Sequence, residues 1–166
     1  DYVYRNQPAG ATALGRFIDR QYLNGIGWRG IRVRRQLLER AGEQAIEQIH
    51  ATKRSVHVVD VAAGAGRYLL DTLKRCESLR VTADLRDAEP ANLDEGRAIA
   101  RSLGLSNVMF TRADAFDRTV LEQVDPIPDV AIVSGLYELS PDNRRVLDSL
   151  EGLAHAIPQG GLLIYT

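Results

Sequence analysis

The segment from Val58 to Tyr68, V-V-D-V-A-A-G-A-G-R-Y, combines an acidic side chain with a bend of small residues. Asp60 lies near the end of an apolar run, and Gly64 and Gly66 follow shortly after it. Glycines let a backbone turn tightly and approach a ligand closely. A carboxylate beside such a bend attracts a cation and repels a diphosphate. These residues therefore predict a binding site for a positively charged ligand.

The spacing of the glycines also bears on the kind of nucleotide that could bind. Nicotinamide-dependent enzymes use a G-x-G-x-x-G pattern, which brings a pyrophosphate to the N-terminus of the following helix. Neither frame is complete here, because Gly64-x-Gly66 is followed by Leu69 and Ala62-x-Gly64 by Arg67. A ligand with an ammonium group and no phosphate fits the carboxylate better, and S-adenosylmethionine is the common one. An NAD-dependent oxidoreductase remains a rival hypothesis.

Three further polar positions follow the later apolar runs. Asp84 ends the second run as Ala83-Asp84-Leu85, and Asp114 follows the third run. The fourth run ends in S-G-L-Y-E over residues 134–138. Ligands of open parallel sheets bind at the carboxyl ends of the strands, so we expect these residues to share one edge with the bend.

In this order and spacing the residues resemble class I S-adenosylmethionine-dependent methyltransferases. Their first motif is an acidic residue followed by a Gly-x-Gly-x-Gly loop, which stands here as D-V-A-A-G-A-G with Ala62 in the first glycine position. We expect Ala62 to cost little if its φ is negative. The resemblance implies that Asp84 binds the ribose hydroxyls and Asp114 the adenine amino group. The cofactor-binding set that it implies is Asp60, Ala62, Gly64, Gly66, Asp84, Leu85, Asp114, Ala115, Ser134 and Gly135.

Longer strings along the whole chain are similar to a narrower bacterial family of methyltransferases. They are N-Q-P-A-G-A-T, G-R-F-I-D-R-Q-Y-L-N-G-I-G-W-R-G-I-R and S-G-L-Y-E-L-S-P-D-N. Members of that family occur alone or attached to an α/β-hydrolase or lipid-synthesis-like domain. The resemblance implies methyl transfer to an unidentified acceptor, a small molecule or a lipid, and fusion to or pairing with further domains.

Methyl transfer from a sulfonium is an in-line displacement, so the protein mainly positions the acceptor. We expect Glu138 to act as a base where the acceptor must lose a proton, and Tyr137 to line the acceptor pocket. Two alternatives stay open for Tyr22, Trp28, Arg29 and Arg32: they close over the cofactor, or they pack the N-terminal segment. A non-catalytic regulatory domain that keeps the fold is a further rival, which the alanine at position 62 favours.

Hydrophobic periodicity predicts the strands and helices that carry these residues. Short apolar runs alternate with amphipathic ones after Ser55, which predicts an α/β fold with a mainly parallel sheet. The resemblance implies that this sheet is doubly wound and Rossmann-like, with the strand order 3-2-1-4-5. The sixth and seventh strands that the resemblance implies are not in the chain. The expected strands are 56–61, 79–83, 108–111, 130–133 and 162–165, and the expected helices are 12–23, 31–50, 68–76, 91–103, 119–124 and 143–156. We therefore predict a helical prefix over residues 1–54 and a cofactor-binding domain over 55–166.

Composition narrows the function further. One cysteine among 166 residues cannot form an internal disulfide, and three scattered histidines predict no metal site, so we expect a cytoplasmic protein. No apolar stretch reaches the roughly 20 residues of a membrane span. Residues 1–55 hold ten basic and five acidic side chains. The basic residues alternate with apolar ones at helical spacing, which favours a solvated helix face over a nucleic-acid or lipid surface.

Overall fold

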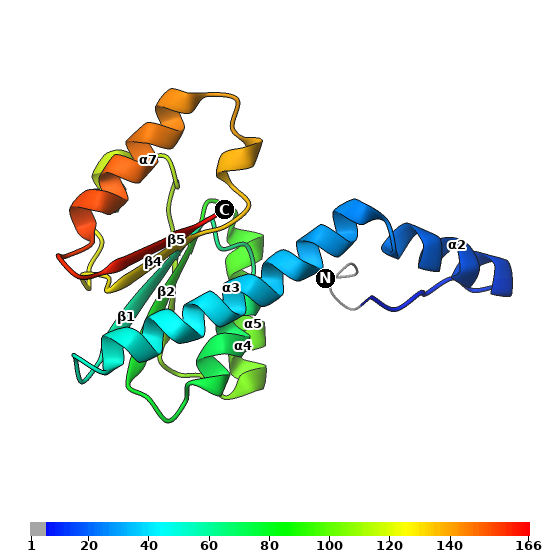
Figure 1. The fold of residues 1–166 in the computed structure, drawn as a ribbon, viewed down its shortest axis with the longest axis horizontal. Helices are drawn as coiled ribbons and strands as arrows, with labels where there is room; N and C mark the ends of the chain where they lie inside the picture. Colours follow the sequence, from blue (N-terminus) through cyan, green and yellow to red (C-terminus); the bar gives the residue numbers. More distant parts are fainter. Residues whose placement is uncertain (1–5) are drawn as a thin grey trace. The chain divides into compact units, whose positions relative to one another are not determined.

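A computed structural model describes residues 6–166 and shows a five-stranded parallel sheet of order β3-β2-β1-β4-β5 (Figure 1). This order confirms the prediction from the sequence. The strands are β1 (Val56–Val61), β2 (Val81–Asp87), β3 (Val108–Arg112), β4 (Val130–Val133) and β5 (Leu162–Tyr165). The central strand β1 separates β2 from β4, and the chain order reverses there. Such a reversal is the usual position of a ligand site in open α/β sheets.

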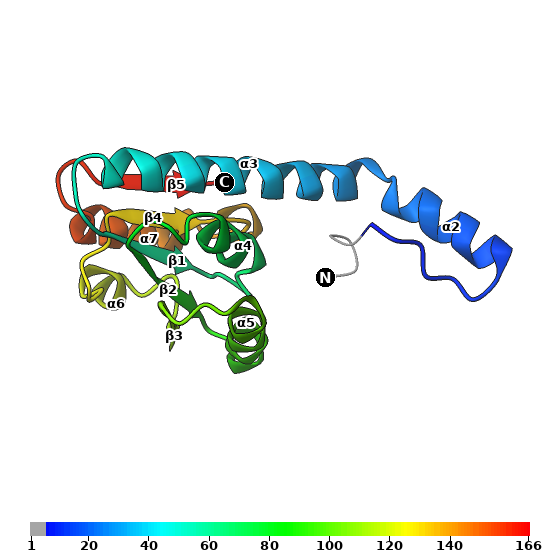
Figure 2. The same cartoon turned by 90° about the horizontal axis from the view of Figure 1, so that it is seen from below.

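Helices cover both faces of the sheet (Figures 1 and 2). One face carries α4 and α5, and the other carries α6 and α7, which pack on each other. Successive side chains of β1 point to opposite faces of the sheet. Val59 and Val61 point to the second face, where they form an apolar core with Leu121 and Leu153. Every residue of β1 is buried, as expected of a strand that is covered on both faces. The bounds are α4 (Arg67–Arg75), α5 (Pro90–Leu103), α6 (Arg118–Glu122), η1 (Tyr137–Leu139) and α7 (Asn143–Ala156).

Two helix boundaries test the capping signals in the sequence. Gly104 follows the expected helix 91–103, where a glycine predicts a left-handed stop, and it does end α5 with a φ of 72°. Before the expected helix 143–156, Ser140 followed by Pro141 predicts the start. The structure differs: Asp142 is the N-cap of α7, because its carboxylate accepts a hydrogen bond from the Arg144 amide at 2.9 Å.

The second strand is also longer than predicted. We expected it to end at residue 83, but β2 continues to Asp87 and pairs with β1 from Val56↔Val81 to Val61↔Arg86. The apolar pattern did not indicate this extension, because Asp84 and Arg86 are charged. They point to one face of the strand and pair with each other, so the sheet buries them together.

The described chain forms two compact units, residues 6–40 and residues 41–166. The first unit contains α2 (Ala13–Leu23) and the first part of α3 (Ile26–His50). This division differs from the boundary at residue 54 that the change of pattern predicted. The last turns of α3 belong to the second unit because they bury apolar side chains there, Ile46 completely.

Contacts inside the first unit hold its two helices together. The Tyr22 and Trp28 rings lie 5.4 Å apart, and Arg32 Nη2 donates to the Leu23 carbonyl oxygen at 2.9 Å. These contacts give three of the four prefix residues a packing role. Within residues 6–166 no helix has the length and apolarity to cross a membrane.

Cys76 lies at the C-terminus of α4 and is buried, in agreement with its expected packing role. Burial raises the pKa of its thiol, and the nearby carboxylates of Glu43 and Glu47 on α3 raise it further. Arg75 beside it forms an ion pair with Glu43.

Candidate functional site

The bend between β1 and α4 has an unusual backbone. Ala62, Gly64 and Gly66 all have positive φ angles, of 55°, 58° and 63°. A negative φ, the condition under which Ala62 would cost little, is therefore not met. A residue with a Cβ costs about 1–2 kcal/mol in this left-handed region, so the loop carries local strain at the first position of its motif.

Leu85 of β2 lies directly under this loop. A Cβ on Gly66 would come within 1.9 Å of Leu85 Cδ2, which no relaxed structure accommodates. Leu85 is fully buried. It therefore supports the backbone of the bend from inside the unit, and glycine at position 66 is required both by its φ and by this close approach.

The amides of the loop are largely used within the protein. Ala63 N donates to the Arg86 carbonyl at 2.9 Å, and Gly66 N donates to the Ala63 carbonyl at 2.9 Å. Gly64 N donates to Asp87 Oδ2 at 2.8 Å. A loop that binds a diphosphate presents its amides to the ligand. Here three of them are committed, and two carboxylates stand nearby, so the bend disfavours an anion.

Asp60 is the most perturbed acid at this position. Its side chain is 1% exposed, and neither carboxylate oxygen makes a hydrogen bond of ordinary geometry to a described residue. Burial raises the pKa of Asp60 to about 7. The Tyr68 hydroxyl on α4 opposes this rise, whereas the charge of Asp87 adds to it. A buried acid that is close to ionising at neutral pH would gain most from a cationic ligand.

Asp87 is a candidate that the sequence analysis missed. It ends β2 and is nearly buried, and its Oδ1 accepts hydrogen bonds from Glu89 N at 2.9 Å and Asn92 Nδ2 at 3.0 Å. Its Oδ2 holds Gly64 of the loop. The signal that could have found it is the start of α5 at Pro90, because that proline places the end of the preceding strand close to Asp87.

Asp84, the residue expected at this strand end, lies three positions earlier and inside the sheet. Its Oδ2 accepts from Arg86 Nε at 2.6 Å, and its Oδ1 accepts from Thr111 Oγ1 at 2.7 Å. The carboxylate is 1% exposed. Asp84 is thus satisfied by Arg86 of its own strand and by Thr111 of β3, and the structure does not bring it to the edge that Asp87 occupies.

Asp114 follows β3 and is exposed. Its Oδ1 accepts a hydrogen bond from Phe116 N at 2.9 Å, which forms a tight turn, while the next residue, Ala115, is buried in the core. The Arg145 guanidinium lies 4.3 Å from the centre of the Phe116 ring and 3.9 Å from Asp114 Oδ2. The Asp114 carboxylate keeps room for a further hydrogen bond.

Ser134 and Gly135 follow β4, which neighbours β1 through the pair Val61↔Val133. Gly135 has a φ of 73°, and its amide donates to Thr166 Oγ1 at 3.1 Å. Tyr137 points to α7, where its hydroxyl bonds Ser149 Oγ at 2.9 Å, and burial raises its pKa. Glu138 is exposed on η1.

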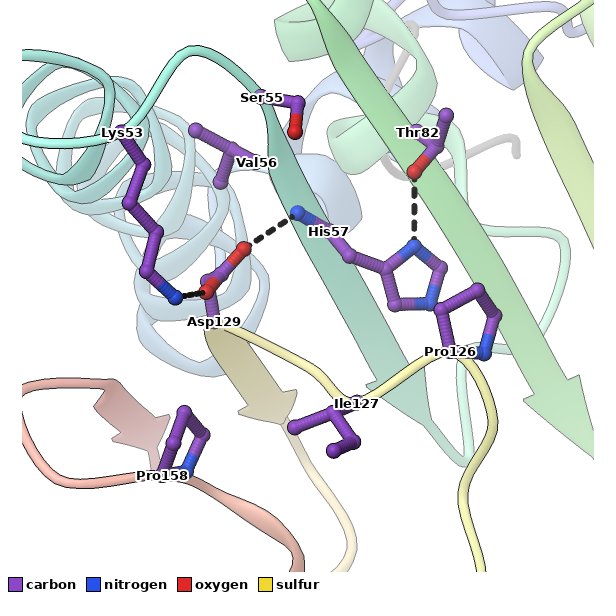
Figure 3. A pocket seen from close by; sticks show the side chains of 9 residues that line it. All are labelled: Lys53, Ser55, Val56, His57, Thr82, Pro126, Ile127, Asp129 and Pro158. Carbon is purple, nitrogen blue, oxygen red and sulfur yellow. Dashed lines mark hydrogen bonds and ion pairs between the residues drawn. The ribbon is translucent and has the colours of Figure 1, made fainter.

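A hollow of about 450 Å³ lies at the opposite edge of the sheet, where β1 begins (Figure 3). Lys53 and His57 N both contact the Asp129 carboxylate there, and His57 Nδ1 lies 2.8 Å from Thr82 Oγ1. Burial lowers the pKa of His57. The hollow therefore lies away from the loop, at the edge that open parallel sheets do not use for ligands. The described residues contain no cluster of side chains arranged to hold a metal ion.

Comparison with known proteins finds one family match that covers residues 1–166, and its description is "Putative methyltransferase". A curated relative, "Uncharacterized protein YnbC" from Escherichia coli (strain K12), is 48% identical over 167 residues. The match covers all of this chain but only 28% of that protein. The chain thus spans little more than a quarter of the curated relative that it matches.

Solved structures share the fold at lower identity. A possible exported protein from Bordetella parapertussis has a TM-score of 0.74 and 21% identity, over 98% of this chain and 51% of that one. A SAM-dependent methyltransferase from Geobacter sulfurreducens, in complex with S-adenosyl-L-homocysteine, has a TM-score of 0.52 and 20% identity. That match covers 74% of this chain and 47% of the other. These likenesses confirm the Rossmann-like fold.

Proposed function

The chain belongs to this methyltransferase family, and on that premise we propose that its second unit binds S-adenosylmethionine and transfers a methyl group to an acceptor. The family match over residues 1–166 supports methyl transfer. Similarity in fold to a methyltransferase that binds S-adenosyl-L-homocysteine supports this choice of cofactor. The acceptor is unidentified.

The observation that carries the proposal is the buried Asp60 carboxyl beside the left-handed loop. Its oxygens have no hydrogen bond of ordinary geometry, and the Tyr68 hydroxyl offsets their burial only in part, so that burial raises the pKa to about 7. A buried polar group in this state is satisfied by a ligand that supplies donors. The ammonium group of the cofactor's methionine part is such a donor, and it carries the charge that stabilises an ionised carboxylate.

Other residues at the same edge fit the remainder of the cofactor. The three hydrogen bonds to Asp87 leave one of the roughly four acceptor positions of a carboxylate free. We assign one of the ribose hydroxyls to Asp87, where the resemblance had suggested Asp84, and keep Asp114 for the adenine amino group. Ser134 and Gly135 complete the edge beside the loop.

S-adenosylmethionine supplies an activated methyl group when it is bound. The protein's own contribution is to orient the acceptor and, where the acceptor must lose a proton, to take it. Glu138 is exposed on η1, next in the chain to the Ser134–Tyr137 segment, and we keep it as the base. The Tyr137 hydroxyl is engaged with Ser149, so its side chain helps to fix this segment against α7.

Calorimetric titration with S-adenosylhomocysteine tests the site. Asp60→Asn should weaken binding by about 1.5–3 kcal/mol, the scale of a hydrogen bond to a charged group. Asp94→Asn is the matched control, because Asp94 is an exposed acid on α5. Equal affinity for wild type and Asp60→Asn would remove Asp60 from the site.

The ribose assignment has its own pair of variants. Asp87→Asn should lose affinity for S-adenosylhomocysteine, since it removes an acceptor at the loop. Asp84→Asn should lower thermal stability, because it breaks a buried ion pair, and should leave affinity nearly unchanged where the variant is folded. A loss of affinity in folded Asp84→Asn, with affinity nearly unchanged in Asp87→Asn, would instead assign the ribose to Asp84.

Turnover needs the full-length protein. A methyl-transfer assay with labelled S-adenosylmethionine and a panel of lipid and small-molecule acceptors should show transfer that Glu138→Gln reduces. Cofactor binding without transfer to any acceptor would favour a regulatory domain. Tight NAD binding without a response to S-adenosylhomocysteine would favour an oxidoreductase.

A further inference from the structure

The first unit, residues 6–40, exposes two apolar stripes that its own helices leave uncovered. On α2, Leu14, Phe17, Ile18 and Tyr22 recur at helical spacing, and each is more than half exposed. Ile26, Val33 and Leu37 form the second stripe on α3 and are also more than half exposed. A unit of this size is too small to bury such residues in a core of its own.

Arginines border the stripe on α3. Arg29 precedes Val33 by four residues, Arg40 follows Leu37 by three, and Arg34 precedes Leu37 by three. Residues three or four apart are neighbours on a helix surface, so these side chains flank the apolar residues. Gly30 lies within the stripe, and the space around it is open.

The charge of the unit is strongly one-sided. Residues 6–40 contain seven arginines and only two acids, Asp19 and Glu39. Both acids are engaged inside the unit: Asp19 Oδ2 accepts from Ala9 N at 3.0 Å, and Glu39 pairs with Arg35 at 2.7 Å. The borders of the α3 stripe therefore meet an approaching surface with positive charge.

The spacing of the basic residues alone favoured a solvated face. Because exposed apolar stripes accompany them, we propose instead that the first unit binds the surface of an anionic phospholipid bilayer. A helix with an apolar stripe and a basic border lies in the plane of a membrane interface, with its apolar side chains among the acyl chains. Long arginine side chains then reach the headgroups. Phe17 and Tyr22 suit this region, because aromatic rings concentrate at membrane interfaces.

Co-sedimentation of the chain with vesicles tests the proposal. Vesicles of phosphatidylcholine and phosphatidylglycerol at three to one should bind the protein, and pure phosphatidylcholine should bind it far less. Raising the salt should weaken binding to the anionic vesicles, since charge pairs at an exposed surface are screened. Equal binding to both vesicles, or no binding to either, would overturn the proposal.

Variants assign the binding to the two stripes. Arg29→Gln and Arg40→Gln should each weaken vesicle binding about fivefold, from about 1 kcal/mol per basic residue. Phe17→Gln with Ile18→Gln should weaken it at low and at high salt. Arg144→Gln and Ile127→Gln are matched controls, because both residues are exposed on the second unit. A loss in these controls as large as in the stripe variants would count against the assignment.

Two other results would contradict the proposal. Binding to an acidic polypeptide such as polyglutamate, without binding to vesicles, would assign the face to an acidic protein. Unchanged vesicle binding with weaker S-adenosylhomocysteine binding in Phe17→Gln with Ile18→Gln would assign the α2 stripe to the cofactor site. Titration of every variant with S-adenosylhomocysteine keeps this test separate from the proposed methyl transfer.

Discussion

The Asp60 carboxyl is in an unfavourable position without a ligand, because burial penalises its charged form. Its pKa of about 7 means that the ligand-free protein holds a proton there over much of the acidic range. A cationic ligand needs the ionised carboxylate. Ligand binding should therefore displace that proton.

Affinity for S-adenosylhomocysteine should consequently rise with pH up to about 7 and level off above it. Below that point the rise approaches tenfold per pH unit, because binding is linked to the loss of one proton. Titration in buffers of different ionisation enthalpy would measure the proton released. The Asp60→Asn variant should show a flat profile in this range, and a wild-type profile that is equally flat would contradict the linkage.

For individual residues, the sequence was informative at the bend after β1, because a tight bend favours particular residue types. Asp60 and the small residues after it were predicted from composition and spacing alone, and the structure places them together. The separation of Asp84 from Asp87 was not predictable in this way. It depends on which carboxylate contacts Arg86 and Thr111 inside the sheet, and Thr111 belongs to the neighbouring strand β3.

At the scale of elements, the loop between β1 and α4 constrains three of its residues in different ways. Ala62 carries a Cβ at a positive φ, and Gly64 has a positive φ with open space around it. Gly66 has both a positive φ and Leu85 beneath it.

Three loop variants should therefore differ in their free energy of unfolding. Ala62→Gly should gain up to about 1 kcal/mol, because relief of left-handed strain outweighs the added freedom of the unfolded chain. Gly64→Ala should lose about 1 kcal/mol from strain alone. Gly66→Ala should lose roughly 2–4 kcal/mol, since overpacking adds about 1–3 kcal/mol to the strain.

Urea unfolding at fixed pH would measure these differences. Gly104→Ala is the reference for strain without a collision, because Gly104 has a φ of 72° and open space around it. A loss in Gly66→Ala no larger than in Gly64→Ala would show that Leu85 moves aside at little cost.

The parallel sheet was predictable because its apolar runs alternate with amphipathic helices, and the order of its strands was predictable from the resemblance to class I methyltransferases. Their bounds were less so: β2 extends through Asp84 and Arg86, whose charges are compensated only by their neighbours in the sheet. The φ of Ala62 was also not predictable from its residue type, because alanine normally takes a negative φ. Likewise, the unit boundary inside α3 reflects packing of that helix rather than a change in composition.

For the whole molecule, two buried groups act on stability in opposite directions. His57 has a lowered pKa, so the unfolded chain binds more protons and stability falls as pH drops below about 6.5. Asp60 has a raised pKa, so the folded chain binds more protons and stability falls as pH rises from about 4 through 7.

Single variants should separate the two contributions. Asp60→Asn should raise the stability of the ligand-free protein at pH 8, by an amount on the order of a few kcal/mol, and leave little change at pH 4. His57→Gln should remove the His57 contribution that opposes Asp60, so stability should rise more, or fall less, between pH 7 and pH 5 in this variant than in wild type. Urea midpoints across this range would measure both effects, and a wild-type pH dependence retained in both variants would contradict the two assignments.

The buried Cys76 at the end of α4 has a practical consequence. It is the single thiol of the chain, and its raised pKa keeps it in the unreactive protonated form. Alkylation by iodoacetamide must therefore wait until this end of α4 opens. The labelling rate in the native protein would therefore report how often this end of α4 opens, without an engineered probe.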